Sequence, residues 1–569
     1  MKMSWKVAGA AMMGSALFLT ACGSGGGQGQ GGPDAGAAQS AGADISSLVS
    51  MNTQPRENLQ DGGRVTLPVL NIGPDFNRNS QNGNSSANVL MLGVYNTAAT
   101  QGCWTYQPDG TAVLNQDFCQ SFDSSTEDGK QVITIKVNDQ AVWNDGTPIA
   151  ADAFINTWKM RNGEDPSINI VTPGLYGNIE SVEQGATPKD VTVTMKQPSY
   201  PLADIFGTII NPNINTPEIF NNGLVGDPKP EWAAGPFKLE NYDSSARTIS
   251  FVPNENWWGT APVLDQLVFR QMEDSASIAA FRNQEIDAVD GRTLNRYNQL
   301  QGSPNSEILR GQRLFAGGLN INPQQAPMDD VDVREAIWTA VDRQAIAAIR
   351  YQGLNWEETT PGSMMLMPFS QYYQDNWPVT ESGPAAAKQV LTDVGYTEGS
   401  DGKMTKDGQP ISFRITNFGD DPTGIALVQT LQQQLNDAGM DVSIDQRGNN
   451  EFGQVLGQRS FQLTISGYTV GSDATSAVKQ YYDSQTGAVK TGDAELDQRI
   501  ADLQGIADDA ERNKAAMEVE KDHMAKYYTM GVLFNGPQII FARTGLANYG
   551  ASLFQDSGYV DWTLVGWQN

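Results

Sequence analysis

Residues 132–160, VITIKVNDQAVWNDGTPIAADAFINTWKM, contain in order the patterns of a strand, a tight turn and a helix. Val132–Val137 alternates β-branched apolar residues with others, which predicts a half-buried strand. Asn144-Asp145-Gly146 supplies turn chemistry, because glycine adopts a positive φ without strain, and Pro148 stiffens the exit. Ala150–Met160 follows with a helical pattern. The stretch therefore predicts one strand–turn–helix unit.

The centre of this stretch resembles a known family. Val142–Pro148, VWNDGTP, resembles the signature of the family 5 extracytoplasmic solute-binding proteins, the peptide, dipeptide and nickel binders of ABC importers. Each further block is a weak signal alone, but the set follows the family's order over roughly residues 65–540. These blocks are Gly177–Glu183, Val191–Lys196, Gly235–Leu239, Asn254–Gly259, Leu264–Arg270, Phe281–Ala288, Val331–Ile337, Leu427–Val442 and Phe461–Tyr468.

The resemblance implies an α/β fold of the periplasmic-binding-protein-like type II, in which two lobes, one enlarged by an extra domain, are joined by two hinge crossings. Local patterns in the second half agree, because helices and strands alternate as βαβ units require. They are a helix at Ala385–Val394, a strand at Ile411–Thr416, a helix at Leu427–Asn436 and a strand at Val442–Asp445. By analogy, the crossings are expected near Leu314–Ile321 and Val532–Phe541.

The same resemblance gives expected domain boundaries. They are a signal peptide at 1–21, a lipidated cysteine and flexible tether at 22–60, lobe 1 at 61–95, the additional domain at 96–205, lobe 1 again at 206–316, lobe 2 at 317–535 and a return to lobe 1 at 536–569.

The N-terminus has the pattern of a secretory signal. Lys2 and Lys6 precede the apolar run Val7–Leu19, which is short for a membrane span. Leu19-Thr20-Ala21-Cys22 resembles the lipobox of bacterial lipoproteins, whose cysteine is acylated, for example with palmitate; an ordinary signal with an incidental cysteine is the alternative. Residues 23–43 hold no aromatic residue and one charge, so they predict a flexible tether.

Composition limits the partners. There are 65 Asp and Glu against 37 Lys and Arg, a net charge of −28, which argues against nucleic acid as a partner. No later apolar run approaches the length of a membrane span, so we expect membrane contact through the lipid alone. Cys103 and Cys119 are the two remaining cysteines. In an oxidising compartment they predict a disulfide, with two buried thiols as the alternative.

Catalytic and metal-binding signatures are missing from the sequence. His523 is the single histidine, and its charged helical surroundings predict a half-exposed side chain. No serine lies in a Gly-x-Ser-x-Gly motif, no paired Cys and His ligands for zinc occur, and no glycine-rich phosphate loop is followed by lysine. Paired carboxylates for glycoside hydrolysis have no sequence signature, so that alternative stays open. We therefore expect a binding protein without enzymatic activity, metal or cofactor.

The expected ligand site departs from the family pattern at two places. Peptide binders place an aspartate in the turn after the strand that matches Phe461–Ser466, where this chain has Gly471, and Asp473 is the candidate substitute. Dipeptide binders place an arginine after the strand that matches Ile411–Thr416, where this chain has Asn417-Phe-Gly-Asp-Asp421. Without these ionic anchors, we expect free di- and tripeptides to bind weakly. The candidate ligand-binding residues are Asn77, Asn417, Phe418, Tyr468, Thr469 and Asp473.

The leading hypothesis is a lipid-anchored receptor on the outer face of the cell membrane, which captures peptides or peptide-like solutes by hinged closure and delivers them to an ABC permease and its ATPase. A non-peptide solute, such as a glycoside or a lipid-linked sugar, is a second transport hypothesis. The third is a non-transport lipoprotein scaffold for cell-envelope glycolipid assembly.

Overall fold

The computed structural model describes most of the chain after the N-terminal segment. The predicted signal, Cys22 and the tether as far as residue 44 lie outside the described residues. None of the described helices is both long and apolar enough to cross a membrane. The described residues are 45–84, 89–95, 101–107, 110–419, 421–448, 451–471, 473–485, 487–553 and 560–569.

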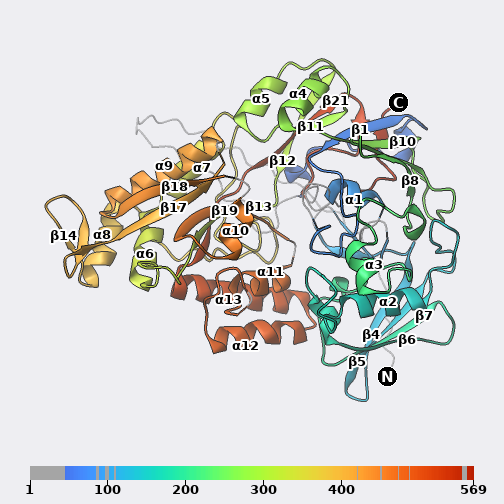
Figure 1. Ribbon diagram of the computed structural model, residues 1–569, viewed down its shortest axis with the longest axis horizontal. Coiled ribbons are helices and arrows are strands. Elements are labelled where there is room, and N and C mark those ends of the chain that lie inside the picture. The colour runs from blue at the N-terminus through green and yellow to red at the C-terminus, as the bar shows by residue number, and fades with distance from the viewer. Residues whose placement is uncertain are drawn as a thin grey trace, which may run out of the picture. The chain divides into compact units, whose positions relative to one another are not determined.

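The strand–turn–helix unit is confirmed. Strand β5 (Lys130–Val137) leads through a turn, in which the Trp143 backbone N–H donates to the Thr147 carbonyl at 2.8 Å, to helix α2 (Ala151–Arg161). Gly146 adopts a φ of 84°, as the turn requires. An antiparallel sheet in the order β4-β5-β7-β6 surrounds β5, and α2 packs on it (Figure 1). We call this sheet with α2 the additional domain; its other strands are β4 (Cys119–Glu127), β7 (Asp190–Met195) and β6 (Ile179–Gln184).

Lobe 1 is built on a second four-stranded sheet. Its order is β1-β10-β9-β8, with β1 parallel to β10 and the other pairs antiparallel. Both inner strands present apolar side chains to one core, where Phe251 meets Phe269 edge to face. The strands are β1 (Arg64–Val69), β10 (Gln266–Gln271), β9 (Thr248–Pro253) and β8 (Phe237–Asp243).

Lobe 2 has a five-stranded sheet in the order β18-β17-β19-β13-β20. The expected alternation of helices and strands is confirmed, although α9 begins at Pro422, five residues earlier than predicted, because the Asp421 side chain caps its first turn. The elements are β13 (Phe315–Ile321), α6 (Val331–Ala340), α7 (Arg343–Arg350), α8 (Pro384–Asp393), β17 (Ser412–Phe418), α9 (Pro422–Asp437), β18 (Asp441–Arg447), β19 (Leu463–Thr469) and β20 (Met530–Phe534).

Two neighbouring chain segments connect lobe 2 to a three-stranded sheet in the order β11-β21-β12. Strand β12 continues into β13, and β20 continues into β21, so the partners stay side by side through both connections. Between them, the Arg313 backbone N–H donates to the Gly536 carbonyl at 3.1 Å. The two expected crossings are therefore confirmed. The strands of this crossing sheet are β11 (Ala288–Asp290), β12 (Ser306–Gln312) and β21 (Pro537–Arg543).

Strand β21 of the crossing sheet is buried on both faces. In β21, Ile539 and Phe541 belong to the core of lobe 2, whereas Ile540 and Ala542 belong to the core of lobe 1. This division follows from the two-residue period of a strand, which sends successive side chains to opposite faces. One strand thus packs against both lobes, which explains why its sequence is apolar without alternation.

The remaining elements are short strands and peripheral helices. They are η1 (Ile45–Leu48), η2 (Arg56–Asn58), α1 (Val89–Tyr95), β2 (Trp104–Tyr106), β3 (Ala112–Leu114), η3 (Gly174–Asn178), η4 (Leu202–Asp204), α3 (Pro217–Asn222), η5 (Pro230–Trp232), α4 (Asp274–Arg282), α5 (Leu294–Leu300), β14 (Thr397–Glu398), β15 (Met404–Lys406), β16 (Gln409–Pro410), α10 (Phe452–Gly457), α11 (Ala474–Tyr482), α12 (Ala494–Asp502), η7 (Leu503–Gly505), α13 (Asp509–Tyr527), β22 (Leu546–Ala547) and β23 (Gly566–Trp567).

The prediction for His523 is wrong. The side chain is fully buried on α13, between the rings of Tyr482 and Tyr527. Its Nε2 lies 2.7 Å from the Thr491 carbonyl oxygen, which can only accept, so Nε2 carries the proton. Burial lowers the pKa of His523 to about 4. The adjacent Lys521 and Asp522 are exposed, whereas Glu520 is buried near His523 and accepts from the Tyr482 hydroxyl. Helices α11 and α12 pack on α13 and account for this burial.

Candidate ligand-binding site

Four predicted ligand residues lie at the carboxyl ends of two neighbouring strands of lobe 2. Asn417 and Phe418 end β17, and Tyr468 and Thr469 end β19, which runs parallel to β17. The Tyr468 hydroxyl donates to Asn320 Oδ1 at 3.0 Å. The Asn417 amide donates to the Gln446 side chain at 3.0 Å, and Phe418 packs edge to face on a neighbouring ring. The fold thus brings these four residues to one edge of the sheet, and their ligand role stays a prediction.

Asp473 has its carboxylate engaged within lobe 2. It caps α11 by accepting from the Thr475 backbone N–H at 2.8 Å. It also accepts from Asn513 Nδ2 at 3.0 Å and from the guanidinium of Arg512, which is fully buried, at 3.3 Å. A ligand amine would have to compete with these three donors. The contacts therefore hinder Asp473 from taking the place of the family aspartate, and the sequence did not show them.

Asn77 lies apart from the other predicted residues, in lobe 1. Its side chain is 4% exposed, and its amide donates to the Phe220 carbonyl at 2.8 Å, while its Oδ1 accepts from the Asn79 backbone N–H at 3.1 Å. Both polar atoms therefore have protein partners. Asn77 also borders a small cavity of about 30 Å³, which is close to the size of one water molecule.

The additional domain contacts lobe 2 through hydrogen bonds. Ser476 Oγ at the start of α11 donates to Asp204 Oδ2 at 3.0 Å. Gln504 forms two further bonds: its carbonyl accepts from the Tyr200 backbone N–H, and its side-chain oxygen accepts from Asn178 Nδ2, both at 2.9 Å. These contacts join parts of the additional domain and of lobe 2 that lie far apart in the sequence.

Asp204 is the charged group in this contact. Crowding by protein atoms raises its pKa to about 6, opposed by the Ser476 bond, and the nearby Asp473 carboxylate adds to the rise while Arg512 and Arg161 oppose it. The residue is exposed to solvent, and water weakens the effect. The Ser476 bond favours the ionised form of Asp204, whereas crowding by protein atoms favours the protonated form.

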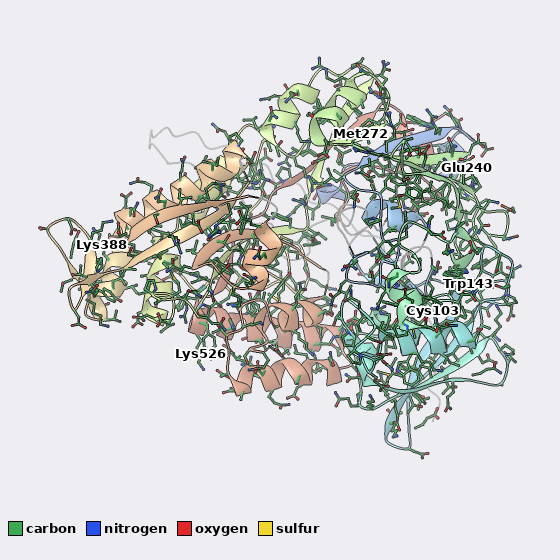
Figure 2. The ribbon with its side chains drawn as sticks, in the orientation of Figure 1. Cys103, Trp143, Glu240, Met272, Lys388 and Lys526 are labelled. Carbon is green, nitrogen blue, oxygen red and sulfur yellow. A yellow bond between two sulfur atoms is a disulfide. The ribbon has the colours of Figure 1, made fainter. Side chains whose placement is uncertain are left out.

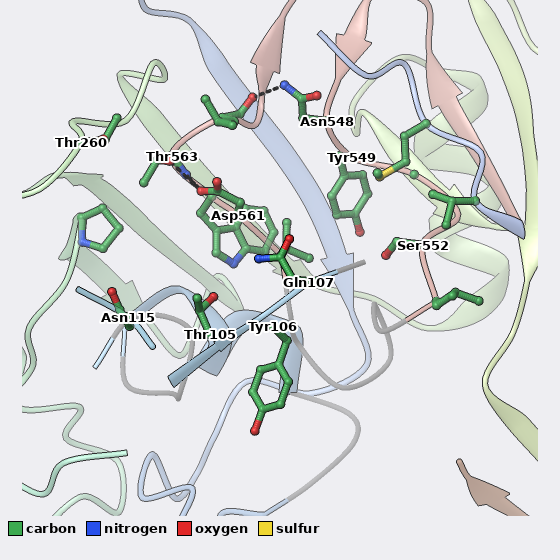
Figure 3. Close-up of a pocket in the computed structure, with 18 of the residues that line it drawn as sticks. Thr105, Tyr106, Gln107, Asn115, Thr260, Asn548, Tyr549, Ser552, Asp561 and Thr563 are labelled. Carbon is green, nitrogen blue, oxygen red and sulfur yellow. Dashed lines mark hydrogen bonds between the residues drawn. The ribbon is translucent and has the colours of Figure 1, made fainter. Parts of the chain in front are cut away.

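A larger pocket of about 540 Å³ lies between the β2–β3 hairpin and the C-terminal segment. We call it the hairpin pocket. Thr105, Tyr106 and Gln107 come from the hairpin side, and Asn548 and Tyr549 lie across from them (Figure 3). Its volume is in the range of small-molecule sites, and its aromatic and amide side chains are typical of them. The remaining described lining residues are Val49, Met51, Asn115, Asp117, Pro236, Trp257, Thr260, Gly550, Ser552, Leu553, Val560, Asp561, Trp562, Thr563 and Leu564.

A disulfide between Cys103 and Cys119 holds the hairpin side of the pocket. The predicted bond is thus confirmed, and Figure 2 shows Cys103 close to Trp143, with which it shares the core of the additional domain. Inside this loop, the Asn115 backbone N–H donates to the Cys103 carbonyl at 2.8 Å, and the Cys119 N–H donates to the Asn115 carbonyl at 2.9 Å. These bonds fix the turn that carries Asp117.

Asp117 is a carboxylate without a partner in this turn. No hydrogen-bond donor or cation among the described residues contacts its side-chain oxygens, although its backbone carbonyl accepts from Trp258 Nε1. Burial raises the pKa of Asp117, and the negative charge of Asp561 raises it further. Asp561 itself accepts from the Thr563 hydroxyl at 2.6 Å. Two acidic groups thus share one pocket.

Trp562 adds a second polar group without a partner. The residue is 1% exposed, stacks on Tyr549 at 6.0 Å between ring centroids and meets Phe269 edge to face. The residue lines the hairpin pocket, but its indole Nε1 is buried and has no hydrogen-bond acceptor in the described structure. A buried donor of this kind is costly unless a ligand or water accepts from it.

Sequence reasoning did not identify the hairpin pocket. Trp257 belongs to a block that indicates only the family resemblance. The one local signal is the position of Asp117, two residues before a predicted disulfide cysteine. In the part of the chain that the structure describes, no group of three or more His, Cys, Asp or Glu residues could hold a metal ion.

Comparison with known proteins identifies the family. The profile of the bacterial extracellular solute-binding proteins, family 5 (Middle), matches residues 117–489, which is more than half of the chain. The oligopeptide-binding protein OppA of Mycobacterium tuberculosis (strain H37Rv) is 26% identical over 533 residues, covering 92% of this chain and 88% of that protein. A second M. tuberculosis protein, "Probable monoacyl phosphatidylinositol tetramannoside-binding protein LpqW", is 25% identical over 55% of this chain and 53% of its own.

Solved structures share the fold. A periplasmic EDTA-binding protein, EppA, superposes with a TM-score of 0.81 at 22% identity, over 92% of this chain and 99% of that one. The oligopeptide-binding protein AppA of Bacillus subtilis, in complex with a nonapeptide, gives a TM-score of 0.70 at 17% identity, over 90% and 100%. Two lobes with an extra domain and two crossings are thus the arrangement of type II periplasmic binding proteins. The chain belongs to the bacterial extracellular solute-binding proteins, family 5.

Proposed function

We propose that this chain is the lipid-anchored receptor of an ABC importer and captures peptides or peptide-like solutes outside the cell. The observation that carries the proposal is the crossing sheet, whose strands connect two lobes side by side. Paired strands at a crossing can act as a hinge, because a few residues at the strand ends absorb the change in backbone angles. A solute that contacts both lobes only in the closed form then shifts the equilibrium toward closure.

The peptide class of solute rests on relatives. The M. tuberculosis OppA aligns over nearly the whole of both chains, and its name describes an oligopeptide-binding protein. In this proposal, the closed receptor docks on a membrane permease that a cytoplasmic ATPase drives. Acylated Cys22 keeps the receptor on the outer face of the membrane, and the tether allows it to reorient. Stable anchoring requires more than one acyl chain, as a lipobox cysteine receives.

Two measurements test this proposal. Native mass spectrometry of the gently purified protein should detect a peptide or a peptide-like solute bound to it, and a preparation from which no solute ever emerges would count against capture. Cys22→Ala should release the protein from the membrane fraction into the medium. If the Cys22→Ala protein stays with the membrane after a high-salt wash, lipidation at this position is wrong.

The partial similarity to LpqW favours a second candidate, a scaffold in cell-envelope glycolipid assembly. It covers only about half of each chain, so it supports this candidate less than OppA supports capture. The two functions differ in the ligand that is bound and in whether it is delivered to a permease. A receptor contracts when a soluble solute binds, whereas a scaffold should bind a mannolipid without delivering any solute to a permease.

A further inference from the structure

The contact between the additional domain and lobe 2 consists of hydrogen bonds between polar groups. The Ser476 hydroxyl donates to Asp204 at 3.0 Å. Gln504 accepts at 2.9 Å from the Tyr200 backbone N–H and at 2.9 Å from the Asn178 side chain. We call these five residues the polar contact. Among the described residues, the apolar cores of the two parts share no side chain, so separation would expose groups that water can satisfy and would break no apolar core.

The additional domain packs differently on lobe 1. Its apolar core includes Ala234, which precedes β8, and Trp258, which lies between β9 and β10, packs against this core. Trp258 meets Phe118 edge to face at 5.2 Å between ring centroids. The Asn144 backbone N–H donates to the Ala233 carbonyl at 2.9 Å. We therefore expect the additional domain to move with lobe 1 when the lobes separate, and the polar contact to be the surface that opens.

Arg512 holds the lobe 2 side of the polar contact in place. Its side chain is fully buried, and its Nε donates at 3.1 Å to the hydroxyl of Thr475, which precedes Ser476. Its Nη1 donates at 3.0 Å to the Ile506 carbonyl, two residues after Gln504. One guanidinium thus fixes both segments of lobe 2 that supply the contact, so little conformational entropy is lost when the contact forms.

The other side of the polar contact, residues 199–206, is held at both ends. The Ser199 backbone N–H donates to Gln131 Oε1 on β5 at 2.8 Å. The Phe206 backbone N–H donates to the Tyr176 hydroxyl at 2.6 Å, and the Phe206 ring is buried in the core of the additional domain. The two contact residues within this segment are therefore ordered by their own domain.

We propose that the polar contact is a latch, which holds lobe 2 against the additional domain and keeps part of the molecules closed before a solute binds. The inference rests on the proposed function, because a latch has a role only if the lobes open and close. Each of its bonds joins two protein groups, so no solute atom is needed to complete it. The latch raises the apparent affinity, which increases with the fraction of molecules already in the form that the solute favours.

The variant Ser476→Asp tests the latch by repulsion. It places a second carboxylate against that of Asp204, and like charges at this distance repel each other. The position lies in the first turn of α11, where a carboxylate favours the helix, so the variant should fold. Asp204→Asn added to this variant should restore the contact, because the amide can donate to the carboxylate. Ser275→Asp is the matched control, since it adds the same charge at an exposed position in the first turn of α4.

Distances between two spin labels measure opening. Glu183→Cys on β6 and Lys514→Cys on α13 place the labels on exposed residues of the additional domain and of lobe 2, outside the polar contact. Cys22→Ala leaves no other free thiol, because Cys103 and Cys119 form the disulfide. Unfolding and refolding without reductant first removes any solute that co-purifies.

In the solute-free chain we expect two distances, that of the closed structure and a longer one. Ser476→Asp should lose most of the closed population, the added Asp204→Asn should recover it, and Ser275→Asp should leave it unchanged. Thermal midpoints show that each variant is folded. A closed population that is missing from the wild type, that Ser476→Asp leaves intact or that Ser275→Asp reduces equally would overturn the latch.

The same labels separate this inference from the proposed function. The small molecules released from the wild-type chain on unfolding, added back to Ser476→Asp, should restore the closed distance, because solute contacts favour closure without the latch. If the wild type is fully open without these molecules and closes when they return, capture by closure is supported and the latch is overturned. If Ser476→Asp opens and the released molecules never close either chain, the latch is supported and closure around a solute is contradicted.

Discussion

Two acidic sites in this chain differ in how their carboxylates are satisfied. Asp473 in lobe 2 accepts from a backbone N–H, an amide and the buried guanidinium of Arg512. Asp117 in the hairpin pocket has no such donor among the described residues, and the pocket wall also contains the unpaired indole of Trp562. The difference indicates that the Asp473 site stabilises the packing of lobe 2, whereas the Asp117 carboxylate contributes no such bond among the described residues.

The largest expected effect comes from breaking the satisfied site. Arg512→Met removes donors to Asp473, Thr475 and the Ile506 carbonyl in a buried position. We expect the free energy of unfolding to fall by about 3 to 5 kcal/mol, because removal of one partner leaves buried polar groups uncompensated. Chemical denaturation monitored by tryptophan fluorescence measures this, with Asp117→Asn as the control that should stay close to wild type. Equal stability of the two variants would refute the contrast.

Loss of the disulfide should be the next largest effect. The bond closes a sequence separation of 16 residues, for which chain entropy gives about 3 kcal/mol of stability. The double variant Cys103→Ser/Cys119→Ser should lose about that much in denaturant titrations. Unchanged stability of the double variant would contradict this contribution.

A smaller effect follows from the raised pKa of Asp117. Burial and Asp561 raise this pKa above the unfolded value, so the contribution of Asp117 to stability is fully present below the unfolded pKa and is lost as pH rises through the folded pKa. At pH 7 the Asp117→Asn protein should therefore have an equal or slightly higher thermal midpoint than wild type. This advantage should shrink at pH 3.5, and a lower midpoint at pH 7 would contradict an unpaired carboxylate.

The smallest expected effect concerns the contact between the additional domain and lobe 2. The pKa of Asp204 is raised to about 6, so its favourable contribution is complete below the unfolded value near 3.8 and is lost as pH rises through about 6. This group should therefore raise the thermal midpoint slightly at pH 5 relative to pH 7.5. Asp204→Asn should remove this pH dependence; a variant that keeps it would point to another group.

Features of the fold that depend on neighbouring residues could be predicted from the sequence. Features that depend on the packing of distant segments could not. The strand–turn–helix unit around Gly146 depends on neighbouring residues and was predicted closely. The apolar run of β21 was recognised as a crossing only by resemblance, because its two faces serve two different cores. His523 was misjudged because the helices that cover it are defined by tertiary packing.

The ligand site shows the same limit. Asn417 and Tyr468 could be placed at neighbouring strand ends from the family order alone. The engagement of Asp473 by Arg512 could not, because those residues lie 39 positions apart and meet only through the packing of α11 on α13. The hairpin pocket joins residue 105 to residue 564. No pattern within a single segment indicates such a meeting.

Small-angle scattering of the mature chain, with and without the solute that co-purifies with it, tests hinged capture most directly. Removal of the solute by gentle unfolding and refolding should enlarge the radius of gyration, and its return should restore the compact profile at the stoichiometry that calorimetry gives. A profile that stays the same while calorimetry reports saturation would contradict closure of the two lobes around a solute.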